Sequence, residues 1–192
     1  MKSLSVLAAV LFCSAHVRAA ALPDSAAAQV VFRPGKRVQC PQADSTPLFR
    51  RINTESEHFL YTTDAADDGN AHVTESQTGF FEPDGVTGRV FTTAQSGTVP
   101  LYHLAHARTQ DHFYTRDAQA RDRALFRDAA YTDAGVAAWV FATRVCGAIP
   151  LWRVHNPVIG AHFYTADPAE RDDKMRNDGY EGLVIAGFVL RA

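Results

Sequence analysis

Residues 150–165 read PLWRVHNPVIGAHFYT, and two further stretches have the same form: PLYHLAHARTQDHFYT at residues 100–115 and PLFRRINTESEHFLYT at residues 47–62. Each begins with Pro-Leu-aromatic and ends with Tyr-Thr, and their starts are spaced by about 50 residues, a period typical of repeat architectures. The sequence therefore predicts one domain, residues 47–192, built from three repeats at residues 47–99, 100–149 and 150–192.

Within a repeat the pattern predicts two short strands joined by a polar turn, then a helix, then a closing aromatic strand. Asp167 precedes Pro168 and is followed three residues later by Glu170. This arrangement is typical of a capping box, in which cap and glutamate side chains satisfy each other's backbone amides. We expect a helix over about 168–177, and a counterpart at about 118–128 that begins after Asp117.

The first repeat departs from the other two. It reads His58-Phe59-Leu60-Tyr61, with one more residue between His and Tyr than in repeats two and three, and we interpret the extra residue as a β-bulge. Asp64 would cap a poorer helix that Gly69 interrupts.

The predicted fold class is mainly β with short helices, a β-rich α+β protein. Val30-Val31-Phe32 resembles the closing strand Trp139-Val140-Phe141, so the N-terminal segment, residues 22–46, is expected to contribute a strand that seals a ring. We therefore expect a closed pseudo-threefold architecture, either a trefoil-like barrel or a small propeller-like ring.

Residues 1–21 have the pattern of a secretory signal peptide: a positive Lys2, an apolar run to Cys13 and a small-residue end at Ala19 and Ala21. Bulky Phe12 before Cys13 argues against a lipid anchor. No later apolar run approaches the roughly 20 residues that span a bilayer. The expected location is secreted or periplasmic, with no membrane span after cleavage.

Two cysteines, Cys40 and Cys146, follow the leader. An even number of cysteines in an oxidising compartment predicts a disulfide. A reactive thiol pair and a pair of metal ligands are the alternatives, although neither cysteine has a CxxC or a histidine at ligand spacing beside it.

The formal net charge is −2, and removing Lys2 and Arg18 with the leader makes the remainder more acidic. A net acidic chain without a Lys/Arg cluster is a poor binder of phosphate backbones. We therefore expect no nucleic-acid partner.

The order of motifs, Pro-Leu-Tyr/Trp, His-Phe-Tyr-Thr, Glu170-Arg171-Asp172 and Gly179-Tyr180-Glu181-Gly182, resembles a secreted repeat family of bacteria and fungi that is catalogued only as a domain of unknown function. The resemblance covers about residues 47–190 and is strongest in the third repeat. It implies an accessory module attached to secreted hydrolases, and hence surface or glycan binding. It carries no catalytic residue over to this chain.

Aromatic side chains stack on the apolar faces of sugars, while polar groups bond their hydroxyls. Phe49, Tyr102 and Trp152 occupy equivalent positions and could serve this purpose or fill the core. The predicted ligand-binding residues are two of these aromatics with polar and aromatic neighbours from the three repeats: Tyr102, Trp152, Arg50, Arg153, Asn53, Asn156, Asp111, His112, Tyr114, His162 and Tyr164.

The repeat histidines His58, His112 and His162 suggest an alternative, a zinc site that leaves one position open for water. A structural role, in which each ring bonds a group within its own repeat, is the favoured interpretation, so we expect neither a metal nor another cofactor. Glu170, Asp172 and Asp173 are interpreted as a solvated helix face.

No hydrolase, phosphate-loop or dinucleotide motif is present, and three similar sites favour avid binding over catalysis. The leading hypothesis is an exported, non-catalytic binding module for a glycan or cell-envelope polymer. One alternative is a metal-dependent hydrolase that uses the repeat histidines, and the other is a module that binds an envelope or host protein. Enzymatic activity is thus disfavoured but stays open.

Overall fold

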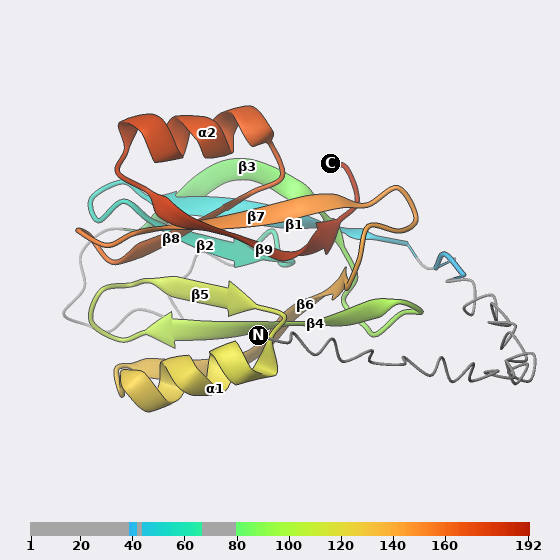
Figure 1. Ribbon diagram of the computed structural model, residues 1–192, viewed down its shortest axis with the longest axis horizontal. Helices are drawn as coiled ribbons and strands as arrows, with labels where there is room; N and C mark the ends of the chain where they lie inside the picture. Colours follow the sequence, from blue (N-terminus) through green and yellow to red (C-terminus); the bar gives the residue numbers. More distant parts are fainter. Residues whose placement is uncertain (1–38, 42–43, 67–79) are drawn as a thin grey trace, which may run out of the picture. The chain divides into compact units, whose positions relative to one another are not determined.

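Antiparallel β-strands are the main secondary structure of the residues that the structure describes (Figure 1). The computed structural model describes residues 39–41, 44–66 and 80–192, and all of them belong to one part of the chain, residues 36–192. Three expectations fall outside the described residues: the leader (1–21), the sealing strand (30–32) and the first-repeat helix around Gly69.

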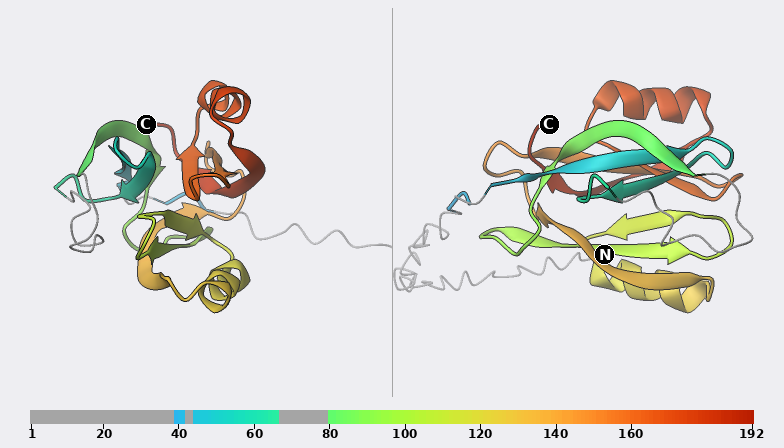
Figure 2. Two further views of the ribbon diagram at one scale, coloured as in Figure 1. Left: turned by 90° about the vertical axis from the view of Figure 1, so that its left-hand side faces the viewer. Right: turned by 180° about the vertical axis from the view of Figure 1, so that it is seen from behind.

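The described strands form three consecutive units, each a three-stranded antiparallel arrangement with its first strand in the middle. Figure 2 shows the three units around a common centre. The first unit comprises β1 (Thr46–Asn53), β2 (His58–Thr62) and β3 (Phe81–Val90); the second β4 (Thr98–His106), β5 (His112–Thr115), α1 (Ala118–Arg127) and β6 (Tyr131–Phe141); the third β7 (Ile149–Asn156), β8 (Ala161–Thr165), α2 (Pro168–Asn177) and β9 (Glu181–Val189).

The β-rich composition with two short helices is confirmed, but the predicted barrel or propeller-like ring is not found in the described residues. They form neither a barrel nor a propeller-like ring but two sheets, β2-β1-β3 and β5-β4-β6-β9-β7-β8. The cause is that the closing strands of different units meet only at single positions. Phe141 pairs with Phe188 inside the larger sheet, and isolated bridges join Arg89 to Leu190 and Phe91 to Trp139.

The inner strands β2, β5 and β8 are joined by tyrosine side chains instead of a backbone ladder. The side-chain hydroxyl of each of these tyrosines, Tyr61, Tyr114 and Tyr164, bonds the backbone of one other tyrosine of the three. It donates to that partner's carbonyl and accepts from that partner's N–H, at 2.7–2.9 Å. The rings meet edge to face, with centroids 5.2–5.6 Å apart. This cyclic arrangement, the tyrosine triangle, satisfies buried backbone groups that an unpaired strand edge would leave without partners.

Close packing of the closing strands requires two glycines. A Cβ on Gly187 would lie 2.6 Å from a methyl carbon of Val140, and one on Gly88 equally close to Val189. Both distances are shorter than van der Waals contact allows, so glycine at these positions permits the approach of neighbouring units.

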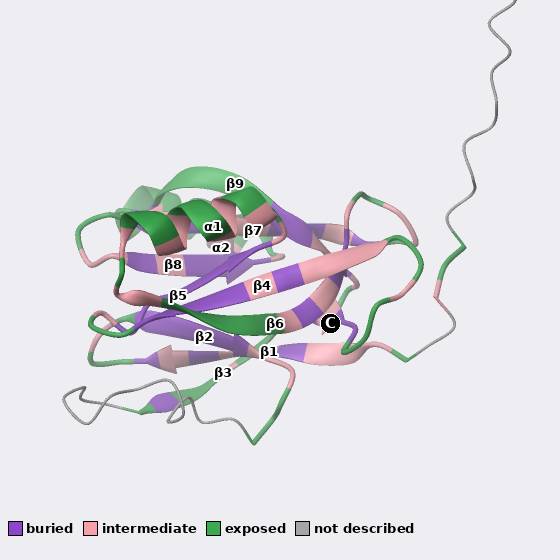
Figure 3. Cartoon of the chain, turned by 90° about the horizontal axis from the view of Figure 1, so that it is seen from below, coloured by how far each residue is buried: buried purple, intermediate pink, exposed green. Residues whose placement is uncertain are grey.

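The helices lie on the outside, α1 on the second unit and α2 on the third (Figures 2 and 3), and neither buries a residue completely. Both begin where predicted. Asp117 and Asp167 accept from the N–H two residues on, at 2.8 Å, and each aspartate's own N–H donates to the threonine that ends the preceding strand. No helix in the described part of the chain is long and apolar enough to cross a membrane.

The predicted reciprocal capping box is not formed in α2. The Thr165 hydroxyl accepts from the N–H of Asp167, which is the amide that a capping glutamate would otherwise satisfy. Glu170 is therefore available for other partners, and its carboxylate accepts from Thr165 and pairs with Arg50.

Cys40 and Cys146 form a disulfide, with their Cα atoms 5.6 Å apart. Cys146 lies in the connection between β6 and β7, so the bond attaches the segment before β1 to the connection between the second and third units.

Candidate functional site

A surface groove of about 360 Å³ lies between the second and third units. One side is formed by the end of β5 and the start of α1, and the other by β7 and β9. We call it the Arg153 groove. Its walls include Arg116, Asp117, Arg123, Arg153, Val184 and Ile185.

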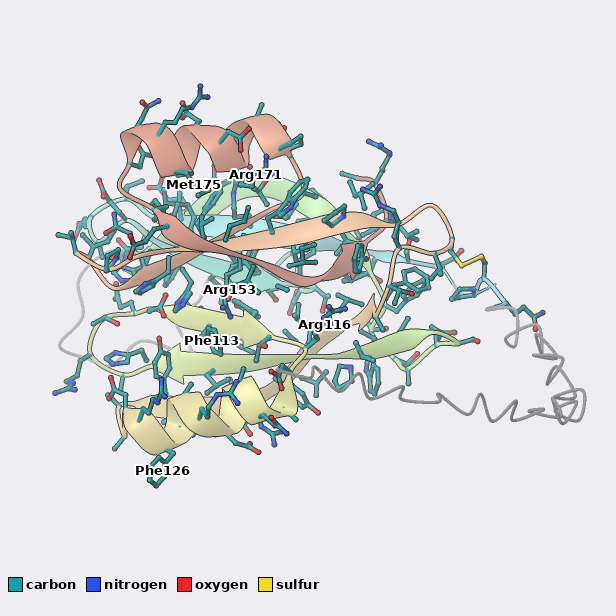
Figure 4. The ribbon with its side chains drawn as sticks, in the orientation of Figure 1. Phe113, Arg116, Phe126, Arg153, Arg171 and Met175 are labelled. Atoms are coloured by element: carbon teal, nitrogen blue, oxygen red, sulfur yellow. A yellow bond between two sulfur atoms is a disulfide. The ribbon has the colours of Figure 1, made fainter. Side chains whose placement is uncertain are left out.

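Arg153 is held in a defined orientation by aromatic neighbours. Its guanidinium carbon lies 4.8 Å from the centre of the Phe113 ring, and Figure 4 shows the two side chains next to each other between the second and third units. Tyr164 is the partner of Arg153 in the register of β7 and β8. No carboxylate among the described residues lies within ion-pair distance of it, whereas nine such ion pairs occur elsewhere in the described chain.

Two further arginines border the groove. Arg116 donates to the carbonyl of Ala142 and lies over Phe188 at 5.8 Å. Arg123 lies 3.6 Å from Asp117, and both side chains are more than half exposed. An exposed pair of this kind is weak, so the groove combines three guanidinium groups with one carboxylate, that of the helix cap Asp117.

The opposite wall is apolar and accessible. Val184 and Ile185 of β9 are exposed to 43% and 38%. A concave site with a few directed polar groups beside apolar surface is the usual form of a ligand-binding pocket.

A second groove, of about 600 Å³, lies between the third and first units and contains Arg50. Its arginine is fully engaged: Nε lies 2.7 Å from Asp84, and Nη1 lies 2.7 Å from Glu170. Burial lowers the pKa of Arg50, but Tyr61, Glu170 and Asp84 outweigh this effect and raise it. We call this the Arg50 groove.

The two grooves are equivalent by strand register. Arg50 pairs with Tyr61 across β1 and β2, and Arg153 pairs with Tyr164 across β7 and β8. His103 takes the same place in the second unit, opposite Tyr114. Of the predicted ligand residues, Arg50 and Arg153 are thus the two that the structure places in grooves.

The predicted sugar platforms, Tyr102 and Trp152, are half-buried and covered on one face. Arg121 of α1 lies 4.4 Å from the Tyr102 ring centre, and Arg171 of α2 lies 4.5 Å from that of Trp152. These contacts attach each helix to its own unit, so the two aromatics serve helix docking rather than forming open stacking surfaces.

Asn53 and Asn156, predicted to bond ligand hydroxyls, are buried and stabilise turns instead. The Asn156 side chain accepts from the N–H of Val158 and donates to the carbonyl of Asp178. Asn53 accepts from two turn amides and donates to Gln110. Their polar atoms thus already have partners within the protein.

Asp111 is also internal, with 1% of its surface exposed. Its carboxylate accepts from the N–H of His162 at 2.7 Å and the hydroxyl of Tyr131 at 2.5 Å, and lies 2.7 Å from His162 Nδ1. Burial raises the pKa of Asp111, but His162 and Tyr131 together hold it far below its ordinary value. Asp111 and His162 therefore connect units rather than face a ligand.

Tyr114 and Tyr164, which were also predicted to contact ligand, are buried. Each is 1% exposed, and each hydroxyl is used twice within the tyrosine triangle. Both side chains belong to the core.

The histidines do not occupy equivalent positions. β1 and β2 pair without a register shift, so the predicted bulge is absent, and Phe59 stands where His112 and His162 stand in the other units. His112 Nδ1 lies 2.8 Å from His103 Nε2, and His58 Nδ1 lies 2.6 Å from the Ser56 carbonyl. Among the described residues, no group of three His, Cys, Asp or Glu side chains is arranged to hold a metal ion.

Sequence reasoning missed Arg116, Arg123, Val184 and Ile185, because they come from segments distant in sequence. The sequence feature that could have pointed to this groove is a difference between repeats. Three residues after the capping aspartate, α2 has Glu170 whereas α1 has Ala120.

A family model described as "Domain of unknown function (DUF5648)" matches residues 47–190. Neither the curated proteins nor the solved structures contain a match to this chain.

Proposed function

The chain belongs to the DUF5648 family, and on that premise we propose that it is an exported, non-catalytic binding module that recognises a glycan or cell-envelope polymer through the Arg153 groove. The observation that carries the proposal is the composition of this groove. Its guanidinium groups can donate to several oxygens, and the exposed Val184 and Ile185 offer apolar contact opposite them. A sugar ring presents both kinds of surface.

The form of the groove also supports binding. About 360 Å³ lies within the range of small-ligand pockets. The groove opens at the surface between two units, so a long polymer could pass through it without an end having to enter.

Export is part of the proposal and is supported by the leader pattern at residues 1–21 and by the Cys40–Cys146 disulfide. Structural disulfides are typical of oxidising compartments. A secreted or periplasmic module would meet envelope polymers directly.

The test is retention of the mature chain, residues 22–192, on insoluble peptidoglycan and chitin, with and without EDTA. We expect retention that EDTA does not change. Ile185→Ser removes apolar contact in the groove without changing charge and should weaken retention several-fold. Val158→Ser, at a side chain 88% exposed and outside the groove, is the matched control and should behave like wild type.

Retention that EDTA abolishes would favour the metal-dependent alternative. Lack of retention on every polymer would contradict a polymer-binding function, and attention would then turn to a protein partner.

A further inference from the structure

The Arg153 and Arg50 grooves occupy equivalent places but differ in charge. Val86 pairs with Phe49 in the first unit, as Ile185 pairs with Trp152 in the third. Asp84, one partner of Arg50, lies two residues before Val86. The residue two positions before Ile185 is Leu183, which carries no charge. The other partner, Glu170, is replaced by Ala120. The Arg153 groove thus keeps the arginine and lacks both carboxylates that neutralise its counterpart.

We propose that the Arg153 groove is an anion site, which binds a carboxylate or phosphate group carried by the polymer. The inference rests on the proposed function, because it names the chemical class of the same site's ligand. A bound anion would take the place that the carboxylates of Asp84 and Glu170 take beside Arg50.

The orientation of Arg153 suits this role. A guanidinium group binds a carboxylate or phosphate through two parallel hydrogen bonds. The contact with the Phe113 ring orients the group before the ligand arrives, so less conformational entropy is lost on binding. In the Arg50 groove the same geometry binds two carboxylates at 2.7 Å.

The neighbours add to the positive potential. Arg116 uses one of its five N–H groups on the Ala142 carbonyl, and Arg123 is paired at 3.6 Å with an exposed Asp117 that water screens. The apolar side chains of Val184 and Ile185 form the opposite wall, so a ligand seated between the two walls would displace water there, which strengthens an ionic contact.

The first experiment compares one polymer with and without its charge: immobilised polygalacturonate and the same polymer with its carboxylates methyl-esterified. We expect wild type to be retained on the acid form and at least about tenfold less on the ester, with retention that falls as salt rises. Arg153→Gln should lose about tenfold on the acid form. Arg176→Gln, the same change on the exposed surface of α2, should have no effect.

A second variant leaves Arg153 in place, in case Arg153→Gln disturbs folding. Ala120→Glu introduces the carboxylate that Glu170 supplies to Arg50, with Thr115 placed to donate to it as Thr165 does to Glu170. A glutamate in the first turn of a helix is favourable, so the variant should fold and lose retention like Arg153→Gln. Gln119→Glu adds a similar charge in the same turn, outside the groove lining, and is its control.

Inorganic phosphate and polyphosphate distinguish the two sources of anion. Phosphate should raise the Tm of wild type and of the Gln119→Glu variant, but not of the Ala120→Glu variant. Stronger retention on polyphosphate than on polygalacturonate would assign phosphate as the ligand group, and the reverse would assign carboxylate.

The outcomes separate the two proposals. Retention on a polymer that is equal on acid and ester forms and insensitive to Arg153→Gln and Ala120→Glu would overturn the anion site and leave the binding module standing. A phosphate-dependent rise in Tm without retention on any polymer would support the anion site and overturn the polymer-binding function. Absence of both effects would overturn both.

Discussion

At the scale of single residues, the tyrosine triangle shows how a side chain can replace a backbone ladder. The hydroxyl of Tyr114 serves two backbone groups of Tyr61, accepting from its N–H and donating to its carbonyl. Burial raises the pKa of Tyr61 and Tyr164 above the ordinary value, so both hydroxyls stay protonated and able to donate even in alkaline solution.

Tyr114→Phe should lower the free energy of unfolding by about 2–6 kcal/mol, because two buried backbone groups of Tyr61 lose their partner at a cost of about 1–3 kcal/mol each. Urea denaturation would measure the loss. Tyr102→Phe is the control: it also removes a hydroxyl, from a half-buried residue whose hydroxyl makes no hydrogen bond to the described chain. If both variants unfolded at the same urea concentration, the triangle would not be stabilising.

Residue patterns in the sequence correctly indicated the capping aspartates Asp117 and Asp167, because a cap depends on amides only two residues away. They did not indicate the role of Tyr114 or Tyr164. A strand pattern shows which side chains share a face, but not whether that face meets solvent, ligand or another unit.

At the scale of secondary-structure elements, Asp111 connects three strands. It immediately precedes β5 and bonds His162 of β8 and Tyr131 of β6. Both carboxylate oxygens act as hydrogen-bond acceptors here. The NH₂ group of an asparagine would instead face at least one of these N–H or O–H donors.

Asp111→Asn should lower the free energy of unfolding by about 3 kcal/mol at neutral pH, the scale for breaking a buried ionic contact. The folded-state pKa of Asp111 is depressed, so its contribution is present above the ordinary pKa of about 3.9 and is lost as pH falls below it. The difference between wild type and variant should therefore shrink below about pH 4.

Urea unfolding at several pH values tests this prediction. Asp173→Asn, on the exposed face of α2, removes the same charge and should change stability little at any pH. A difference between wild type and Asp111→Asn that stayed constant down to low pH would show that the ionised carboxylate is not the stabilising group.

The elements also show where prediction from sequence ended. Both described helices and the strands of the His-Phe-Tyr-Thr segments lie where the sequence predicted, because periodicity and caps are local. The prediction of a bulge in the first unit was wrong, because it came from aligning His58 with the other two histidines. The strand register aligns Tyr61 with Tyr114 and Tyr164 instead.

At the scale of the whole molecule, the Cys40–Cys146 bond attaches the segment before β1 to the connection between the second and third units. Its position follows from the sequence, since Cys40 and Cys146 are the two cysteines after residue 21. The sheet organisation did not follow, because repeat spacing gives the number of units but not how their edges meet.

Cys146→Ser should lower the free energy of unfolding by about 4–5 kcal/mol in the chain-entropy model, since the bond closes a sequence separation of 106 residues. Reduced wild type should unfold at the same urea concentration as the variant. Thiol titration under denaturant should find no free thiol in a chain that begins at residue 22. Two thiols per chain would contradict the bond.

The tyrosine triangle has a consequence for how many units such a protein can have. In a solenoid each repeat contacts only its neighbours, so repeats can be gained or lost at an end. Here the tyrosine hydroxyl of each unit satisfies the backbone of the preceding unit, and the hydroxyl of the first unit satisfies the backbone of the third. Deleting one unit would leave one hydroxyl and one strand edge without partners, and a fourth would have no position in the triangle. Duplication or loss of a single unit is therefore incompatible with this core, and the copy number is a property of the fold.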